Sequence, residues 1–164
     1  MTLRRLDEAL VGELLEVAVQ SATPEETMPP VEGPPGWTEA RRRAFVEFYA
    51  VRLDGLDGEH RTAMFAVLAD GEVAGMIRLA RTDTDGEYET GMFLGGAQRG
   101  RGLGKAALRA VLDEARLLGA RAVVADTTPG NLAALATLRA VGAELATDEA
   151  AGKVLARINV AGER

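Results

Sequence analysis

The chain has 164 residues, of which 47% are hydrophobic and 4% aromatic, with a formal net charge of −6, one histidine and no cysteine. This length and composition predict a single domain over residues 1–164 whose core needs no metal and no disulfide, and they exclude thiolate metal sites and thiol catalysis. An acidic chain poor in aromatic residues is not expected to bind nucleic acid and, without an apolar run of about 18 residues, it is expected to be cytoplasmic with no membrane partner.

The first third of the chain predicts a strand at residues 2–5, two helices and a long loop between them. Residues 23–36 contain five of the six prolines and two glycines, so neither a helix nor a central strand is expected there. Loops of this length without secondary structure are often functional lids. The helices are expected over about residues 6–20 and after Thr38, a favourable N-cap. The apolar face of the second helix is predicted to consist of Ala44, Phe45, Phe48 and Val51.

The remaining two thirds predict a sheet with two further helices. In chain order we expect strands at 64–69, 72–80 and 87–94, a helix at 103–118, a strand at 122–125, a helix that follows residues 128–131 and ends near Gly142, and a strand at 154–158. Asp70-Gly71 is typical of the turn of a hairpin between the first two of these strands. This order predicts an α/β fold with a mixed, mostly antiparallel central sheet flanked by helices, rather than a doubly wound sheet.

A basic, glycine-rich turn stands between the strand at 87–94 and the helix at 103–118. Residues 98–105 read Gln-Arg-Gly-Arg-Gly-Leu-Gly-Lys. Glycines allow backbone N–H groups to approach an anion closely, and the first turn of a helix leaves about four N–H groups unpaired. Positive charge is also concentrated here, on Arg99, Arg101, Lys105 and Arg109. A phosphate-bearing ligand is therefore expected at this turn.

Three other interpretations of the turn fit less well. A Rossmann-type glycine turn follows the first parallel strand, whereas this one lies past mid-chain behind antiparallel strands. A Walker-type phosphate loop needs Ser or Thr where Ala106 stands. A glycine turn without a ligand remains open, although it assigns no purpose to the four cations.

The spacing of Arg99, Gly102 and Gly104, with Asn131 and Gly142 further along, resembles the GNAT superfamily of acyl-CoA-dependent N-acyltransferases. The resemblance implies a GNAT-like fold and acetyl-CoA as the acyl donor, with no metal. It also implies that the CoA pyrophosphate binds the turn and that the pantetheine arm pairs with the preceding strand. The residues expected to contact acetyl-CoA are Phe93, Leu94, Arg99, Gly100, Arg101, Gly102, Leu103, Gly104, Lys105 and Asn131. Asn131 is equally well placed to cap the helix that follows.

Acyl transfer to an amine requires a group that accepts a proton from the amine. Glu87 and Glu89 share one face of their strand, with Tyr88 on the other. The resemblance implies Glu89 as the catalytic base and leaves Glu87 as the second candidate, while an equal alternative is that both are solvent-facing carboxylates. The family's frequent general acid, a tyrosine, is replaced here by Leu138. Water is the expected proton donor to the leaving thiolate, with Tyr49, Tyr88 or a loss of catalysis as alternatives.

The acceptor is expected at the proline-rich loop, because the resemblance implies that the first helices and their loop set specificity. The predicted acceptor-binding residues are Glu25, Glu26, Glu32 and Trp37, with Trp37 alternatively an anchor of the loop to the core. Carboxylates there favour a small cationic amine, aminoglycoside-like or polyamine-like, with antibiotic resistance as one role. The alternatives are N-terminal acetylation of a ribosomal or other protein and a non-catalytic acyl-CoA-binding module. The oligomeric state is open, with a homodimer among the options.

Overall fold

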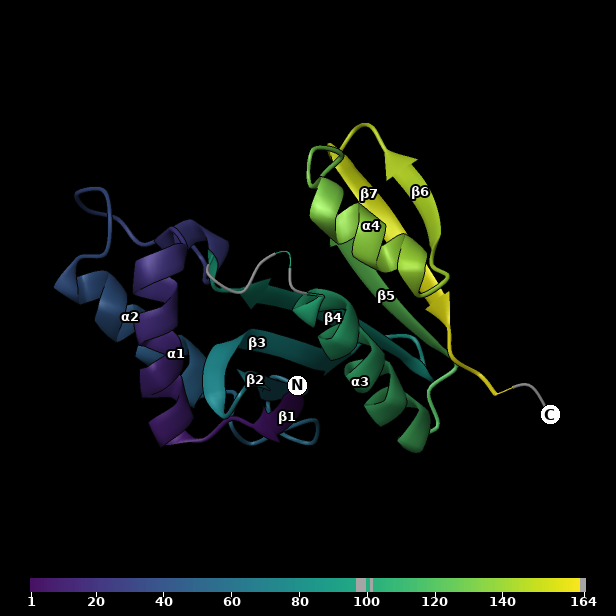
Figure 1. Cartoon of the computed structure of the whole chain (residues 1–164), viewed down its shortest axis with the longest axis horizontal. Coiled ribbons are helices and arrows are strands. Elements are labelled where there is room, and N and C mark those ends of the chain that lie inside the picture. The colour runs from purple at the N-terminus through teal and green to yellow at the C-terminus, as the bar shows by residue number, and fades with distance from the viewer. Residues whose placement is uncertain (97–99, 101, 163–164) are drawn as a thin grey trace.

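A mixed sheet runs through the molecule and carries helices on both faces (Figure 1). The computed structural model describes residues 1–96, 100 and 102–162. Within these residues the sheet has seven strands in the order β1-β2-β3-β4-β5-β7-β6. The elements are β1 (Thr2–Arg5), α1 (Glu8–Ser21), the 3-10 helix η1 (Pro24–Glu26), α2 (Glu39–Ala50), β2 (Thr62–Ala69), β3 (Glu72–Arg81), β4 (Glu87–Leu94), α3 (Leu103–Leu117), β5 (Ala122–Thr127), α4 (Leu132–Ala140), β6 (Glu144–Asp148) and β7 (Lys153–Asn159).

One parallel pair of strands interrupts an otherwise antiparallel sheet. β4 and β5 pair in parallel from Glu87 with Ala122 to Glu89 with Val124, and α3 provides the crossover that such a pair needs. After Glu89 the described residues of the two strands form no further pair, and Figure 1 shows β4 and β5 running in diverging directions. The sheet is therefore split between its two halves.

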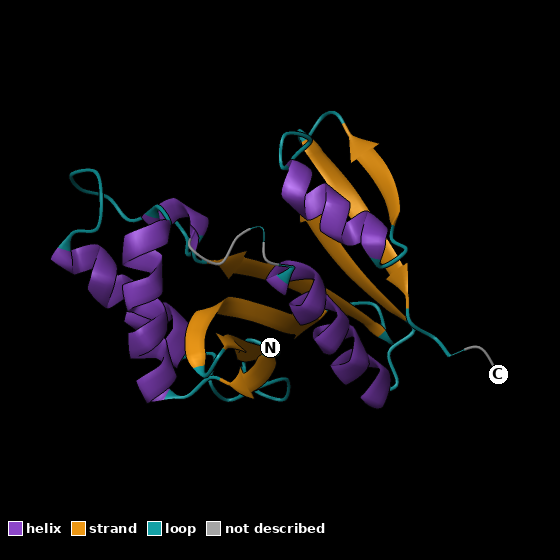
Figure 2. Cartoon of the chain, in the orientation of Figure 1, coloured by secondary structure: helices purple, strands orange, loops and turns teal. Residues whose placement is uncertain are grey.

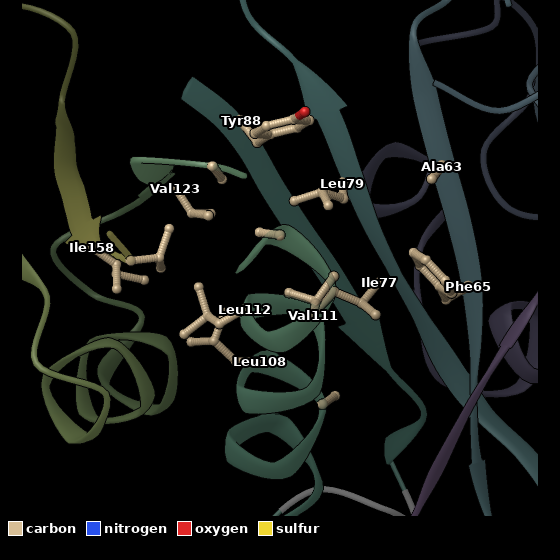
Figure 3. Close-up of a cluster of buried hydrophobic side chains, with 14 of the residues drawn as sticks. Ala63, Phe65, Ile77, Leu79, Tyr88, Leu108, Val111, Leu112, Val123 and Ile158 are labelled. Carbon is tan, nitrogen blue, oxygen red and sulfur yellow. The ribbon is translucent and has the colours of Figure 1, made fainter. Parts of the chain in front are cut away.

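Two hydrophobic cores lie on opposite faces of the strands β2 to β4, with helices from the first and second halves of the chain around them (Figure 2). Successive strand residues point to opposite faces, so β2 contributes Met64 to the core with α1 and α2, and Phe65 to the core with α3. In the second core, Val111 of α3 lies beside Ile77 of β3, and Leu112 lies next to Leu108 on the side toward Ile158 of β7 (Figure 3). The predicted fold class is confirmed.

The ends of the helices follow local signals in the sequence. Asp7 caps α1 by accepting the Leu10 N–H at 2.8 Å, and Thr38 caps α2 by accepting the Arg41 N–H at 3.2 Å. Gly119 follows α3 with a φ of 78°, as expected for a C-terminal glycine. The predicted borders of α1 and α3 lie within two residues of the observed ones. None of the helices in the described part of the chain is long and apolar enough to cross a membrane.

Three local predictions were wrong. The strand β6 was not predicted, because it is an edge strand with mostly exposed residues and lacks an alternating apolar pattern. The proline-rich loop contains the single turn η1, which begins at a proline and is closed by a capping box between Thr23 and Glu26. Val51 was predicted on the buried face of α2 but is 53% exposed, because the helix ends at Ala50. Tyr49 is buried instead, four residues after the buried Phe45.

Candidate active site

Glu89 stands at the point where the sheet splits. It forms the last parallel pair with β5, opposite Val124, and the two strands separate beyond it. β4 runs on to Leu94 alongside β3. An extended ligand with polar groups fits along the edge of β4 that faces away from β3, because a strand edge presents N–H and C=O groups to a partner.

The glycine turn after β4 leads into the N-terminus of α3. Gly100 and Gly102 have φ values of 77° and 76°, in the left-handed region that favours glycine. Apart from adjacent residues, no described atom lies within 4 Å of a Cβ built on either one. No described side chain caps α3, and its first turn has no acidic residue, so its N–H groups and the open space fit an anion. That first turn holds the predicted contacts Leu103, Gly104 and Lys105. Arg99 and Arg101 lie outside the described residues.

The other predicted acetyl-CoA contacts occupy different positions around the fold. A Cβ on Gly104 would lie 3.6 Å from Leu94 Cδ1, which is an ordinary contact distance. Phe93 points to the opposite face, against the core of α1 and α2. Asn131 is the N-cap of α4, where its Oδ1 accepts the Ala134 N–H at 3.1 Å. Thus Leu94 and Gly104 lie together, and the Asn131 side chain serves as a helix cap in this structure.

A cavity of about 360 Å³ lies between the proline-rich loop, the end of α2 and the strands β2 to β4. Its lining includes Glu25, Glu26, Phe48, Tyr49, Arg52, Arg78 and Glu89. The structure therefore brings the predicted base Glu89 together with two of the predicted acceptor-binding residues. This volume is near the lower end of the range of small-molecule sites.

Arg78 of β3 holds the Glu89 carboxylate in place. Its Nε donates to Glu89 Oε2 at 3.0 Å, and its Nη2 donates to Oε1. The pKa of Arg78 is raised, mainly by this hydrogen bond and against the effect of burial. A Cβ on Gly91 would lie 2.5 Å from the Arg78 guanidinium carbon, so glycine at that position leaves the room that the arginine occupies.

Three of the predicted site residues lie away from this cavity. Glu87 lines a different cavity beside the β3–β4 turn, and its carboxylate accepts a hydrogen bond from Arg157 of β7 at 2.9 Å. Glu32 is exposed and is not part of the Glu89 cavity lining. Trp37 donates its indole N–H to the Ala22 carbonyl at 2.9 Å, and its ring packs edge-on against the Phe45 ring of α2. Trp37 thus anchors the loop to the core.

The tyrosines and Leu138 occupy structural positions. Leu138 is 6% exposed and belongs to the core around α3. Tyr49 donates its hydroxyl to the Thr27 carbonyl at 2.9 Å, and burial raises its pKa. Tyr88 lies in the opposite core and accepts a hydrogen bond from Arg81 at 3.0 Å. Of the two tyrosines, only Tyr49 lines the cavity that contains Glu89.

The sequence analysis missed Arg78 and Arg52 as site residues. The sequence did contain a signal for Arg78, a charged residue within an otherwise apolar strand. In the alternation of β3, Arg78 lies on the same face of the sheet as Glu89 of the neighbouring strand β4. No comparable signal existed for Arg52, which lies just beyond a helix end. Within the described residues, no group of three or more His, Asp or Glu side chains could hold a metal ion.

The family of the chain follows from comparison with protein families. The model of the Acetyltransferase (GNAT) family matches residues 24–143. The chain belongs to the GNAT acetyltransferase family. It is therefore an N-acetyltransferase of the acyltransferase class, in a family that uses acetyl-CoA. A comparison with curated proteins finds no matching sequence.

Solved structures of this family share the fold. Aminoglycoside acetyltransferase AAC(6')-Ib in complex with coenzyme A is 21% identical with a TM-score of 0.72, over 96% of this chain and 94% of that one. The Escherichia coli ribosomal-protein-S18-alanine N-acetyltransferase is 16% identical with a TM-score of 0.66, over 99% and 96%. The GNAT domain of S. lividans PAT is 17% identical with a TM-score of 0.71, over 96% and 89%. The names of the first two state different acceptors, an aminoglycoside and a ribosomal protein, and the likeness of all three to this chain concerns the fold alone.

Proposed function

We propose that this GNAT enzyme transfers the acetyl group of acetyl-CoA to the primary amine of a small molecule, with Glu89 as the general base. The observation that carries the proposal is the position of Glu89, which lies both at the vertex of the β4–β5 split and on the wall of the cavity. A donor along β4 and an acceptor in the cavity meet at this carboxylate.

Binding of acetyl-CoA is supported by the backbone of the glycine turn and of β4. The open space at Gly100 and Gly102 and the N–H groups of α3 suit a pyrophosphate. The edge of β4 beyond Glu89 suits the amide groups of the pantetheine arm. Arg99, Arg101 and Lys105 are proposed to add positive charge for the phosphates.

The chemical step requires a neutral amine. An ordinary alkyl amine has a pKa near that of lysine, so at pH 7 only about one molecule in 10³ is neutral. In the proposed step Glu89 takes one proton from the ammonium group, and the neutral amine nitrogen attacks the thioester carbonyl carbon. The C–S bond then breaks, and the second proton that the nitrogen loses passes through water to the leaving thiolate. Arg78 binds one side of the carboxylate and leaves further lone pairs of both oxygens for the amine or a bridging water.

The acceptor is proposed to enter past Glu25 and Glu26. Both residues are exposed and line the cavity, where their charges attract an ammonium group. A cavity of about 360 Å³ favours a small amine over a protein N-terminus, the chief enzymatic competitor. Because the E. coli neighbour acts on a ribosomal protein according to its name, the test also includes peptides as acceptors.

The experiment measures thiol release from acetyl-CoA across a panel of amines. The panel contains aminoglycosides, spermidine, amino acids with their amides, and peptides that begin with alanine. The proposal expects saturable turnover with a small amine and weaker turnover with the peptides. Turnover confined to peptides would favour the protein N-terminal acetyltransferase, and tight CoA binding without turnover on any amine would show a non-catalytic module.

A further inference from the structure

Arg52 brings to the cavity a positive charge that no described carboxylate neutralises. It lies two residues after the end of α2 and lines the cavity that contains Glu89. Its guanidinium stacks on the Phe48 ring, 3.7 Å from the ring centroid, and its Nη1 donates to the Phe48 carbonyl at 2.6 Å. These two contacts orient the side chain without supplying a negative charge.

Two of the three carboxylates that line the cavity are engaged by other groups, and the third, Glu25, is exposed and forms no ion pair with Arg52 among the described residues. The Glu89 carboxylate pairs with Arg78, and the Glu26 carboxylate accepts the Thr23 N–H at 2.8 Å as part of the η1 capping box. The pKa of Arg52 is lowered, mainly by burial; the charge of Tyr49 opposes this decrease and that of Arg78 adds to it. An anion at the Arg52 guanidinium would therefore be stabilised electrostatically.

The donor phosphates are not suited to this position. Arg52 lies near Tyr49 and Arg78, and the latter pairs with Glu89. Glu89 precedes the end of β4 at Leu94 by five residues, or about 17 Å along the strand. The glycine turn proposed for the pyrophosphate follows that end. The anion at Arg52 is therefore expected to belong to the acceptor.

We infer that the acceptor carries a carboxylate that binds Arg52 while its amine faces Glu89, so that amino acids and amino-acid-like amines are the preferred substrates. A guanidinium fork matches a carboxylate in geometry and charge, and the stacking on Phe48 holds the fork ready. A polyamine, by contrast, brings a second cation against Arg52. This inference rests on the proposed acetyl transfer and names its substrate class.

The test compares substrates that differ only in the carboxylate. Thiol release from acetyl-CoA is measured for a set of amino acids, their α-amides and the corresponding decarboxylated amines. For the wild type, kcat/KM with the acid is expected to exceed that with the amide by about 10- to 100-fold, as for other charge-assisted hydrogen bonds. Arg52→Gln is expected to bring this ratio close to 1. Arg43→Gln is the matched control, because Arg43 is an exposed arginine of α2 that lies outside the cavity and pairs with Glu39.

A charge reversal provides a second readout that damage to the fold cannot imitate. Arg52→Glu is expected to prefer a diamine over the acid, which is a gain of activity for one substrate. A wild type that uses amides or amines as well as acids, or an unchanged ratio in Arg52→Gln, overturns the inference and leaves the proposed function standing. Absence of thiol release with every amine overturns the proposed function and the inference with it.

Discussion

The proposed donor side and the proposed acceptor side of the site are built from different parts of the polypeptide. The proposed donor side, at residues 90–96, 100 and 102–105, offers backbone groups, glycines at positive φ and a helix N-terminus. The acceptor side, residues 23–52 with Arg78 and Glu89, consists of side chains from a loop, a helix end and the sheet. The proposed donor side thus depends on backbone conformation, and the proposed acceptor side on the identity of its side chains.

The proposed donor side and the proposed acceptor side are also stabilised by different interactions. The donor side needs glycine at a few positions, and hydrogen bonding within the sheet and α3 supplies the rest. The acceptor side depends on Arg41, which is 4% exposed and holds the loop through its carbonyl groups. Arg41 donates to the carbonyls of Gly36 at 2.8 Å, Val31 at 2.9 Å and Gly33 at 3.1 Å, and also to that of Pro34. A change at one buried arginine should therefore disturb the acceptor side alone.

The largest expected effect is that of Arg41→Ala. Hydrogen bonds to a charged donor contribute about 1.5–3 kcal/mol each but overlap, so we expect the free energy of unfolding to fall by about 3 kcal/mol. The KM for the acceptor should rise at least tenfold, while the KM for acetyl-CoA changes little. Urea unfolding and steady-state kinetics measure both. Arg43→Ala, an exposed change on the same helix, is expected to alter stability by less than about 0.5 kcal/mol. Equal changes in both KM values would contradict the separation of the two sides.

Glu89→Gln tests the point where the two sides meet. Loss of the general base is expected to lower kcat by on the order of 10²-fold, equivalent to about 2.7 kcal/mol, with little change in the KM for acetyl-CoA. Glu87→Gln is the comparison variant, since Glu87 pairs with Arg157 outside the Glu89 cavity. The pH dependence of kcat is measured for both variants. A profile that Glu89→Gln leaves unchanged would remove Glu89 from the role of base.

Gly102→Val tests the donor side. A β-branched residue at a φ of 76° is strained by about 1–3 kcal/mol, and its side chain would fill the space proposed for the pyrophosphate. The KM for acetyl-CoA is expected to rise about tenfold or more, with the acceptor KM unchanged. Gly119→Val is a matched control at the other end of α3, because Gly119 has a φ of 78° and equally open surroundings. If both variants raise the KM for acetyl-CoA alike, strain rather than contact is the cause.

Tyr49→Phe is expected to have the smallest effect. It removes the hydrogen bond to the Thr27 carbonyl, worth about 1 kcal/mol, and loosens one wall of the acceptor side. Burial raises the pKa of Tyr49 above the value of about 10 in the unfolded chain, so its contribution to stability is present below pH 10 and is lost as the pH rises further. Urea unfolding at pH 8 and at pH 10.5 should show a smaller alkaline loss in the variant than in the wild type. An equal loss would place the titrating group elsewhere.

Much of the fold was predictable, and the failures share a cause. The helices α1 and α3, the hairpin β2–β3 and the strand β4 carry strong local signals of apolar periodicity, caps and turns. The strand β6 does not, since it is an exposed edge strand that β7 holds in place. Tyr49 was not predicted to be buried, because the end of α2 depends on packing against the loop rather than on propensity.

The predicted site divides in the same way. Gly100 and Gly102 adopt the left-handed conformation that a close-approach turn requires, and Glu89 lies with Glu25 and Glu26 in one cavity. The base role of Glu89 and the acetyl-CoA contacts stay predictions, and Arg99 and Arg101 lie outside the described residues. The aminoglycoside-like or polyamine-like acceptor was inferred from the family resemblance and the charge of the loop, and the proposal for Arg52 favours an amine with a carboxylate.

By itself the sequence determined the family, the layered α/β fold and the position of the donor turn, because glycine spacing, helix caps and apolar periodicity act within a few neighbouring residues. Only the tertiary structure decided that Arg78 pairs with Glu89, that Trp37 and Arg41 hold the proline-rich loop, and that Arg52 lines the cavity without an ion pair to any carboxylate of the described residues. Those contacts join different elements of the fold, and they depend on strand register and packing that no local pattern encodes.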